Sequence, residues 1–181
     1  QVITGVVKAI GGYVQEIGIA RPQGFMPAGN YWSTQCSDCK DGAMPRPGFD
    51  EALAKKYPWV GDPKDAASME RARKVRWAMA MAIAQESIIK NSLNGLGRVS
   101  YAWENYLPGD PAHKPEWVIP YDPNKARQFM ADAGYPNGFN MELWSPGTNP
   151  PGTVAAADAA AEMWRKELKI NVTIDKTAYA T

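Results

Sequence analysis

The chain of 181 residues has a single histidine and none of the short motifs of common enzymes. His113 lies in a polar stretch before Lys114-Pro115, where a surface side chain is a simpler interpretation than a general base. There is no G-x-S-x-G nucleophile turn, no H-E-x-x-H zinc motif and no phosphate-binding P-loop. These absences argue against an enzyme, and we expect no catalytic residues, no metal ligands and no cofactor.

The chain also lacks an excess of charge of either sign and a long apolar run. Its 20 basic and 19 acidic side chains are dispersed in small mixed groups, which leaves no broad basic surface to hold a nucleic acid. No stretch approaches the roughly 20 apolar residues that span a bilayer, since Val2–Ile10 is short and contains Gly5 and Lys8. We therefore expect a globular protein that binds no nucleic acid.

Cysteine is nearly absent, and the two cysteines, Cys36 and Cys39, form one C-x-x-C in a loop-like stretch. We favour a local disulfide, which suits an extracytoplasmic protein. A structural zinc site would require further ligands that the sequence does not offer. A thioredoxin-like redox pair would require a helix after the motif, which Pro45-Arg46-Pro47 opposes. Free thiols are the remaining alternative.

The most informative segment that is present runs from residue 121 to 144. Asp122, followed by proline, is typical of a helix start, and apolar residues then recur with helical spacing. Gly134, followed closely by proline, is typical of a helix end. Asn137-Gly138 predicts a turn, after which residues 139–144 alternate between apolar and other side chains as a half-buried strand does. The segment therefore predicts a helix, a turn and a strand.

The rest of the chain predicts further helices and strands separated by loops. The expected elements are strands over Val2–Val7 and Gly12–Ile19, a long irregular segment over Arg21–Asp62 with a short helix at Phe49–Lys56, one long helix from Asp62 or Asp65 to about Asn91, a loop over Arg98–Pro120, a helix from a Thr153 cap to about Glu167, and a strand over Lys169–Ile174. The last strand, helix and strand predict a parallel pair joined by a crossover. We expect one α/β domain over residues 1–181, with a mixed sheet flanked by helices.

Three segments resemble one known family. Tyr121–Phe139 closely resembles the pattern YDPxKAxxLLxxAGYPxGF of the family 5 extracellular solute-binding proteins, which are the oligopeptide and dipeptide receptors of ABC importers. Upstream, Arg71–Ile89 is similar to the family's VRxAxxxAIDRExI helix, with Ala84 in place of the usual Asp. Downstream, Ala160–Ile174 is similar to its AxxxQxxLxKxGIxVxI helix-to-strand passage. Three motifs in the family's order are more specific than any one of them.

The resemblance implies most of the second lobe of a two-lobe protein with the type II periplasmic-binding-protein fold. Such a protein is not an enzyme: it captures peptides or similar small organic solutes by closing two lobes about a hinge, and it delivers them to an ABC permease. The resemblance implies a periplasmic or extracytoplasmic location and allows a lipoprotein anchor in the full-length protein. The segment at residues 21–62, which carries the C-x-x-C, departs from the family because it is longer than the family's usual crossing.

Aromatic residues are abundant, with seven tryptophans and eight tyrosines. Several of them, including Trp144, lie outside the predicted core. These residues either cover the core beneath the loops or line a cleft that binds an organic ligand. The resemblance implies ligand contact by further side chains: Tyr13, Gln15, Glu16, Thr153 and Tyr179. Peptide specificity does not follow, because the chain ends before the family's segment that meets a peptide's amino terminus.

Two other functions are compatible with the sequence. One is a metal- or redox-active module built on Cys36 and Cys39, and the other is the ligand-sensing domain of a regulator. Thiol and zinc assays would separate the first of them from a solute-binding lobe.

Overall fold

The structure of the chain is a computed structural model, and it describes part of the sequence. The described residues are 24–25, 27, 35–36, 44–45, 56–62, 64–95, 97–101, 109, 111–145, 147 and 152–177. The two strands predicted before residue 20 lie outside this part of the chain, as does the helix predicted at Phe49–Lys56 apart from its last residue, which is helical.

Two short strands lie within the segment that the sequence predicted to be irregular. β1 (Gln35–Cys36) pairs antiparallel with β2 (Met44–Pro45), in the register Gln35↔Pro45 and Cys36↔Met44. The prediction of an entirely irregular segment was therefore wrong at this point, because a ladder this short carries no detectable alternation. The predicted Cys36–Cys39 disulfide lies outside the described part of the chain, since neither the side chain of Cys36 nor Cys39 is described.

The predicted long helix is two helices, α3 (Ala66–Met81) and α4 (Gln85–Ser92). α3 begins where expected, because the Asp65 carboxylate accepts a hydrogen bond from the Ala67 N–H at 2.9 Å. It ends at Met81, whose carbonyl accepts a hydrogen bond from the Asp122 N–H at 3.0 Å. Ala84, with ψ at 80°, donates its N–H to Met163 Sδ at 3.4 Å before α4 starts. The break thus depends on partners far along the chain, which local periodicity does not reveal.

The segment from residue 121 to 144 folds as predicted. α5 (Pro123–Asp132) is capped by Asp122, whose carboxylate accepts a hydrogen bond from the Lys125 N–H at 2.9 Å. Gly134 follows the helix with φ at 91°, a left-handed conformation that glycine adopts without strain. β3 (Asn140–Trp144) then alternates between exposed and half-buried residues, with Met141 and Leu143 turned inward. The loop before α5 contains a short 3₁₀ helix, η1 (Pro115–Trp117).

The C-terminal unit is a parallel strand pair joined by a helix, as predicted. α6 (Thr153–Leu168) connects β3 to β4 (Asn171–Asp175), and the strands pair from Asn140↔Asn171 to Trp144↔Asp175. Thr153 is the first helical residue and not the cap, which was predicted wrongly. The N-cap position is occupied by Gly152, with φ at 85°. The α/β fold is confirmed, although the described strands form two separate sheets, one antiparallel and one parallel, and not one mixed sheet.

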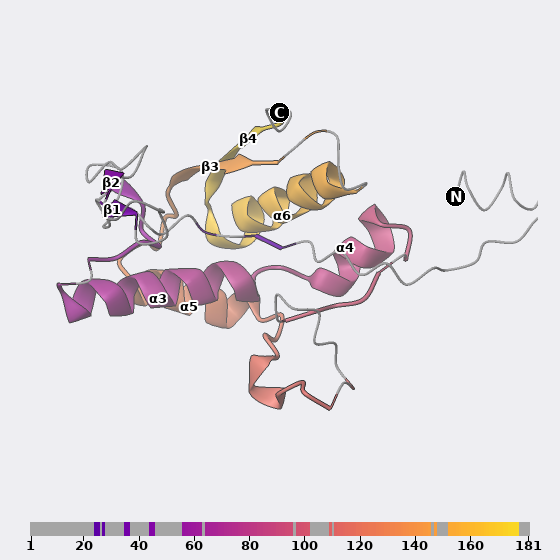
Figure 1. Cartoon of the computed structure of the whole chain (residues 1–181), viewed down its shortest axis with the longest axis horizontal. Coiled ribbons are helices and arrows are strands. Elements are labelled where there is room, and N and C mark those ends of the chain that lie inside the picture. The colour runs from indigo at the N-terminus through magenta and orange to yellow at the C-terminus, as the bar shows by residue number, and fades with distance from the viewer. Residues whose placement is uncertain are drawn as a thin grey trace, which may run out of the picture.

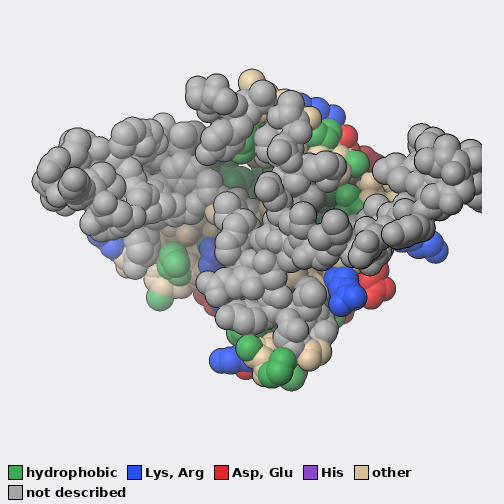
Figure 2. All heavy atoms as spheres, turned by 45° about the vertical axis from the view of Figure 1, so that its right-hand side comes forward, with side chains coloured by type: hydrophobic (Ala, Val, Ile, Leu, Met, Phe, Trp, Pro, Cys, Tyr) green, Lys and Arg blue, Asp and Glu red, His purple; other side chains and the backbone are tan. Residues whose placement is uncertain are grey.

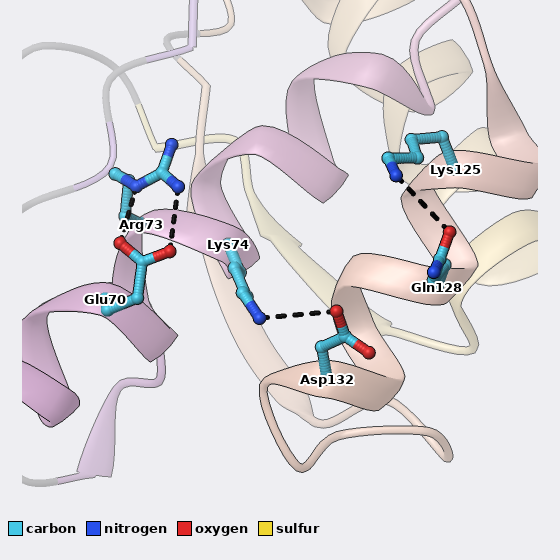
Figure 3. A network of polar contacts seen from close by, with 6 residues as sticks. All are labelled: Glu70, Arg73, Lys74, Lys125, Gln128 and Asp132. Carbon is cyan, nitrogen blue, oxygen red and sulfur yellow. Dashed lines mark hydrogen bonds and ion pairs between the residues drawn. The ribbon is translucent and has the colours of Figure 1, made fainter.

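α6 forms the middle layer of the molecule (Figure 1), between the β3–β4 sheet and the helices α3 and α5, which lie side by side. Its buried face is rich in alanine, which allows close approach from both sides, and includes the almost fully buried Trp164. The indole of Trp164 donates a hydrogen bond to the Met79 carbonyl at 2.8 Å, so α6 and α3 are joined inside the core. An ion pair joins the surfaces of α3 and α5 (Figure 3), where Lys74 of α3 meets Asp132 of α5 at 3.3 Å.

Candidate functional site

The candidate site is the edge of the sheet where both parallel strands end. β3 ends at Trp144 and β4 at Asp175, and these two residues are register partners. In a parallel strand–helix–strand unit, the helix begins at the edge where the first strand ends, so the N-terminus of α6 lies at this edge. Ligands of open α/β sheets bind at the carboxyl ends of the strands, so this edge is the candidate ligand site. We refer to it as the carboxyl edge.

One face of the sheet is polar and exposed up to the carboxyl edge. Asn140 and Asn171 share a hydrogen bond of 3.1 Å, and Glu142 lies opposite Thr173 on the same face. The face ends in Trp144, whose side chain is a large exposed aromatic with 46% of the residue's surface accessible. The arrangement places an aromatic ring beside hydrogen-bonding groups, a combination that suits an organic solute.

Asp175 is held as a carboxylate at this edge. The backbone N–H of Thr177 donates a hydrogen bond to its Oδ1 at 2.9 Å, and the Thr177 hydroxyl donates a second hydrogen bond to the same oxygen. The side-chain hydrogen bond and then the backbone hydrogen bond lower the pKa of Asp175 from its ordinary value. A negative charge therefore lies on the residue that pairs with Trp144.

The N-terminus of α6 lies against two neighbouring elements. Gly152 lies against the end of the Leu93 side chain just after α4, and its φ of 85° is a left-handed conformation that favours glycine. Lys176, which follows β4, pairs with Asp158 in the second turn of α6 at 3.1 Å. Thr153 is half-buried at the start of the helix. Sequence reasoning thus pointed to two residues, Trp144 and Thr153, that the crossover brings to the same end of the sheet.

Ser145 is a feature of the edge that sequence reasoning missed. It continues the ladder beyond β3, because its N–H donates to the Asp175 carbonyl at 2.8 Å. It is only 2% exposed, and within the described residues its hydroxyl has no hydrogen-bond partner. The alternation of β3 was a signal that could have found it, since residue 145 follows Met141 and Leu143 on the inward-facing side.

Several other predictions fall elsewhere. Tyr13, Gln15, Glu16 and Tyr179 lie outside the described part of the chain. His113 was predicted to be a surface side chain, but it is half-buried and its ring meets Trp117 edge-on at 5.9 Å. The physical reason is that η1 folds the indole back onto the histidine, which composition does not show.

Within the described ranges, no group of three or more His, Cys, Asp or Glu residues could hold a metal ion. No helix there is long and apolar enough to cross a membrane. On the face shown in Figure 2, the visible Lys and Arg side chains occur in small groups, some beside acidic ones, in agreement with the balanced composition.

Comparison with known proteins identifies relatives of this unit. Residues 62–181 match the family described as bacterial extracellular solute-binding proteins, family 5 Middle. The glutathione-binding protein of Pectobacterium atrosepticum is 40% identical over 73 residues, which cover 40% of this chain and 14% of that protein. Heme-binding protein A of Haemophilus influenzae is 38% identical over 73 residues, which cover 39% of this chain and 13% of that protein.

Solved structures show the same fold. The periplasmic binding protein AgaA of A. tumefaciens R10, in complex with agropinic acid, has a TM-score of 0.54 and 24% identity, over 69% of this chain and 23% of that one. A dipeptide-binding protein of Pseudoalteromonas sp. SM9913, in complex with Met-Leu, has a TM-score of 0.53 and 26% identity, over 68% of this chain and 24% of that one. The chain thus spans about a quarter or less of the length of these proteins. Because the family match extends over more than half of the sequence, the chain belongs to the bacterial extracellular solute-binding proteins of family 5.

Proposed function

We propose that the chain is most of one lobe of the substrate-binding component of an ABC importer. This component captures a peptide or a similar small organic solute between two lobes and releases it to a permease. The observation that carries the proposal is the carboxyl edge, where the exposed indole of Trp144, the carboxylate of Asp175 and the N-terminus of α6 lie together. The relatives support it, since they are named for binding glutathione, heme and a dipeptide.

The chemistry of the edge suits a solute with an apolar part and charged ends. The indole of Trp144 offers a rigid apolar surface, and a cationic group would be attracted both to its ring and to the Asp175 carboxylate. The first turn of α6, which starts at Thr153, attracts negative charge through its free N–H groups and its dipole. We propose that Tyr13, Gln15, Glu16 and Tyr179 add contacts to the same ligand.

The mechanism is closure about a hinge and not the making of bonds. The carboxyl edge is one wall of the site, and the other lobe supplies the second wall. Closure removes the solute from water, and the closed form is the one that docks on the permease. The protein would act in the periplasm or another extracytoplasmic space, where a lipid anchor is one means of retention and where a Cys36–Cys39 disulfide would persist.

The test is a binding measurement by calorimetry with reduced glutathione, Met-Leu and heme as the solutes. We expect the protein with both lobes to bind one of them with a Kd of about 1 μM or below, near −8 kcal/mol. We expect the 181-residue chain alone to bind about a hundredfold more weakly, because half of the contacts are missing. Trp144→Ala should weaken binding, whereas the matched control Trp117→Ala, on η1, should not. Full affinity of the chain alone, or equal loss in both variants, would contradict the proposal.

A further inference from the structure

The chain folds back on itself after α4. Two successive residues there have the left-handed conformation, Asn94 with φ at 54° and Gly95 with φ at 78°. The Gly95 N–H donates a hydrogen bond to the Ile89 carbonyl at 2.8 Å, which closes the turn at the end of the helix. A Cβ at Gly97 would lie 3.7 Å from the Ile89 side chain, so the segment that follows the turn runs beside α4.

A hollow of about 400 Å³ lies between α4 and this returning segment. Its volume is within the range of small-molecule sites. The hollow is open to solvent, and its lining combines two half-buried apolar residues, three exposed charged residues and a glycine: Ile89, Val99, Glu86, Lys90, Arg98 and Gly97. The arrangement is therefore an apolar surface with charges around it, which suits a small amphipathic molecule.

The charges of the hollow are not used within the described fold. In the described ranges, neither Lys90 nor Arg98 makes an ion pair or a side-chain hydrogen bond, and Glu86 makes none either. Cations of the neighbouring helix α3 differ, because Arg73 meets a glutamate at 2.7 Å and Lys74 meets an aspartate at 3.3 Å. Two cations and one carboxylate leave the hollow with an excess of positive charge, which attracts an anion.

We propose that this hollow binds a small organic anion with one carboxylate and a short aliphatic body. The guanidinium of Arg98 offers parallel N–H donors, the geometry that a carboxylate accepts, and Lys90 adds a second positive charge. The aliphatic body packs on Ile89 and Val99, which removes apolar surface from water. Glu86 lies one helical turn before Lys90, so its charge orients the carboxylate of the ligand away from this end of the hollow.

The carbonyl end of α4 opposes an anion, and Lys90 in the last turn of the helix offsets this effect. The hollow shares no lining residue with the carboxyl edge, whose residues include Trp144 and Asp175. The inference therefore goes beyond the proposed function, and it does not depend on it.

The experiment is a titration of the ¹⁵N-labelled chain with sodium acetate, butanoate and hexanoate, against sodium chloride at equal ionic strength. We expect saturable shifts of the Lys90, Arg98 and Val99 amide signals with hexanoate and none with chloride. Affinity should rise about two- to fourfold for each added CH₂, because part of each methylene is buried. Hexanol and hexylammonium, which have the same body without the negative charge, should bind more weakly. Shifts that do not saturate, affinity that is independent of chain length, or equal binding of hexylammonium would overturn the proposal.

Two matched variants test the contribution of the guanidinium. Arg98→Gln should weaken hexanoate binding about three- to fivefold, the usual range for the loss of an exposed ion pair. Lys64→Gln, which removes an exposed cation outside the hollow, should leave binding unchanged. Because Arg98 has no side-chain partner in the described chain, Arg98→Gln should keep the urea midpoint of the unchanged chain, so weaker binding would not reflect unfolding. Equal affinity in Arg98→Gln and the unchanged chain, or an equal loss in both variants, would contradict the proposal.

Discussion

Replacing Ala84 by aspartate should stabilise the protein. Ala84 is the N-cap residue of α4, and its methyl side chain makes no capping hydrogen bond. The N–H groups of Glu86 and Ser87, two and three residues on, are the ones that a capping carboxylate reaches. The family pattern that this segment resembles has an aspartate at this position, where the chain has alanine.

The expected gain is about 1 kcal/mol, the usual difference between alanine and aspartate at an N-cap. The aspartate also places a negative charge at the positive end of α4, which adds a few tenths of a kcal/mol at low salt. For a chain of this length, about 1 kcal/mol corresponds to a rise in Tm of about 2–4 °C. The backbone of Ala84 already accepts the first hydrogen bond of the helix, from the Ile88 N–H at 3.1 Å, so no rearrangement of the main chain is needed.

The assay is urea and thermal unfolding of three variants. Ala84→Asp and Ala84→Asn should both raise the midpoint, and only the gain in the aspartate variant should diminish as pH falls through its carboxyl pKa. Asp65→Ala, which removes the existing cap of α3, should lower the midpoint by a similar amount. If Asp65→Ala is destabilising and both Ala84 variants leave the midpoint unchanged, the reasoning about α4 is refuted.

Three further predictions follow from particular contacts. Gly138→Ala should destabilise the protein by more than about 1 kcal/mol in urea unfolding, because φ is 70° and a Cβ would collide with the backbone carbonyl of Lys169 at the end of α6. A neutral result would contradict this. Trp164→Phe should lower the free energy of unfolding by about 1–3 kcal/mol, because it leaves the buried carbonyl of Met79 without the indole N–H that donates to it at 2.8 Å. A much smaller decrease would show that water replaces the indole. Thr177→Ala should raise the pKa of Asp175, because it removes the side-chain hydrogen bond that lowers this pKa. An NMR titration of the Asp175 carboxyl would measure the change. Because the pKa of Asp175 is lower in the folded state, its ionised form stabilises the fold at pH values above the unfolded-state pKa, and this contribution is lost as pH falls through the folded-state pKa. The Thr177→Ala variant should therefore lose less stability on acidification than the unchanged chain.

Much of the local structure could be predicted from the sequence because its causes are local. Asp122 caps α5 through an amide three residues away, and Gly134 ends the same helix by its own backbone freedom. The alternation in β3 followed from neighbouring side chains. The division of α3 from α4 was missed, because it depends on Asp122 and Met163, which are distant in the sequence.

The candidate site shows the same division. The sequence by itself determined that Trp144 ends a strand, that a helix starts near Thr153 and that the chain resembles one family, because each depends on residues close together in the chain. Only the tertiary structure decided that these residues share one edge with Asp175, because parallel pairing of β3 and β4 sets which residues lie opposite each other. The burial of Ser145 was decided there too, since a hydroxyl becomes costly only when packing removes it from water without supplying a partner.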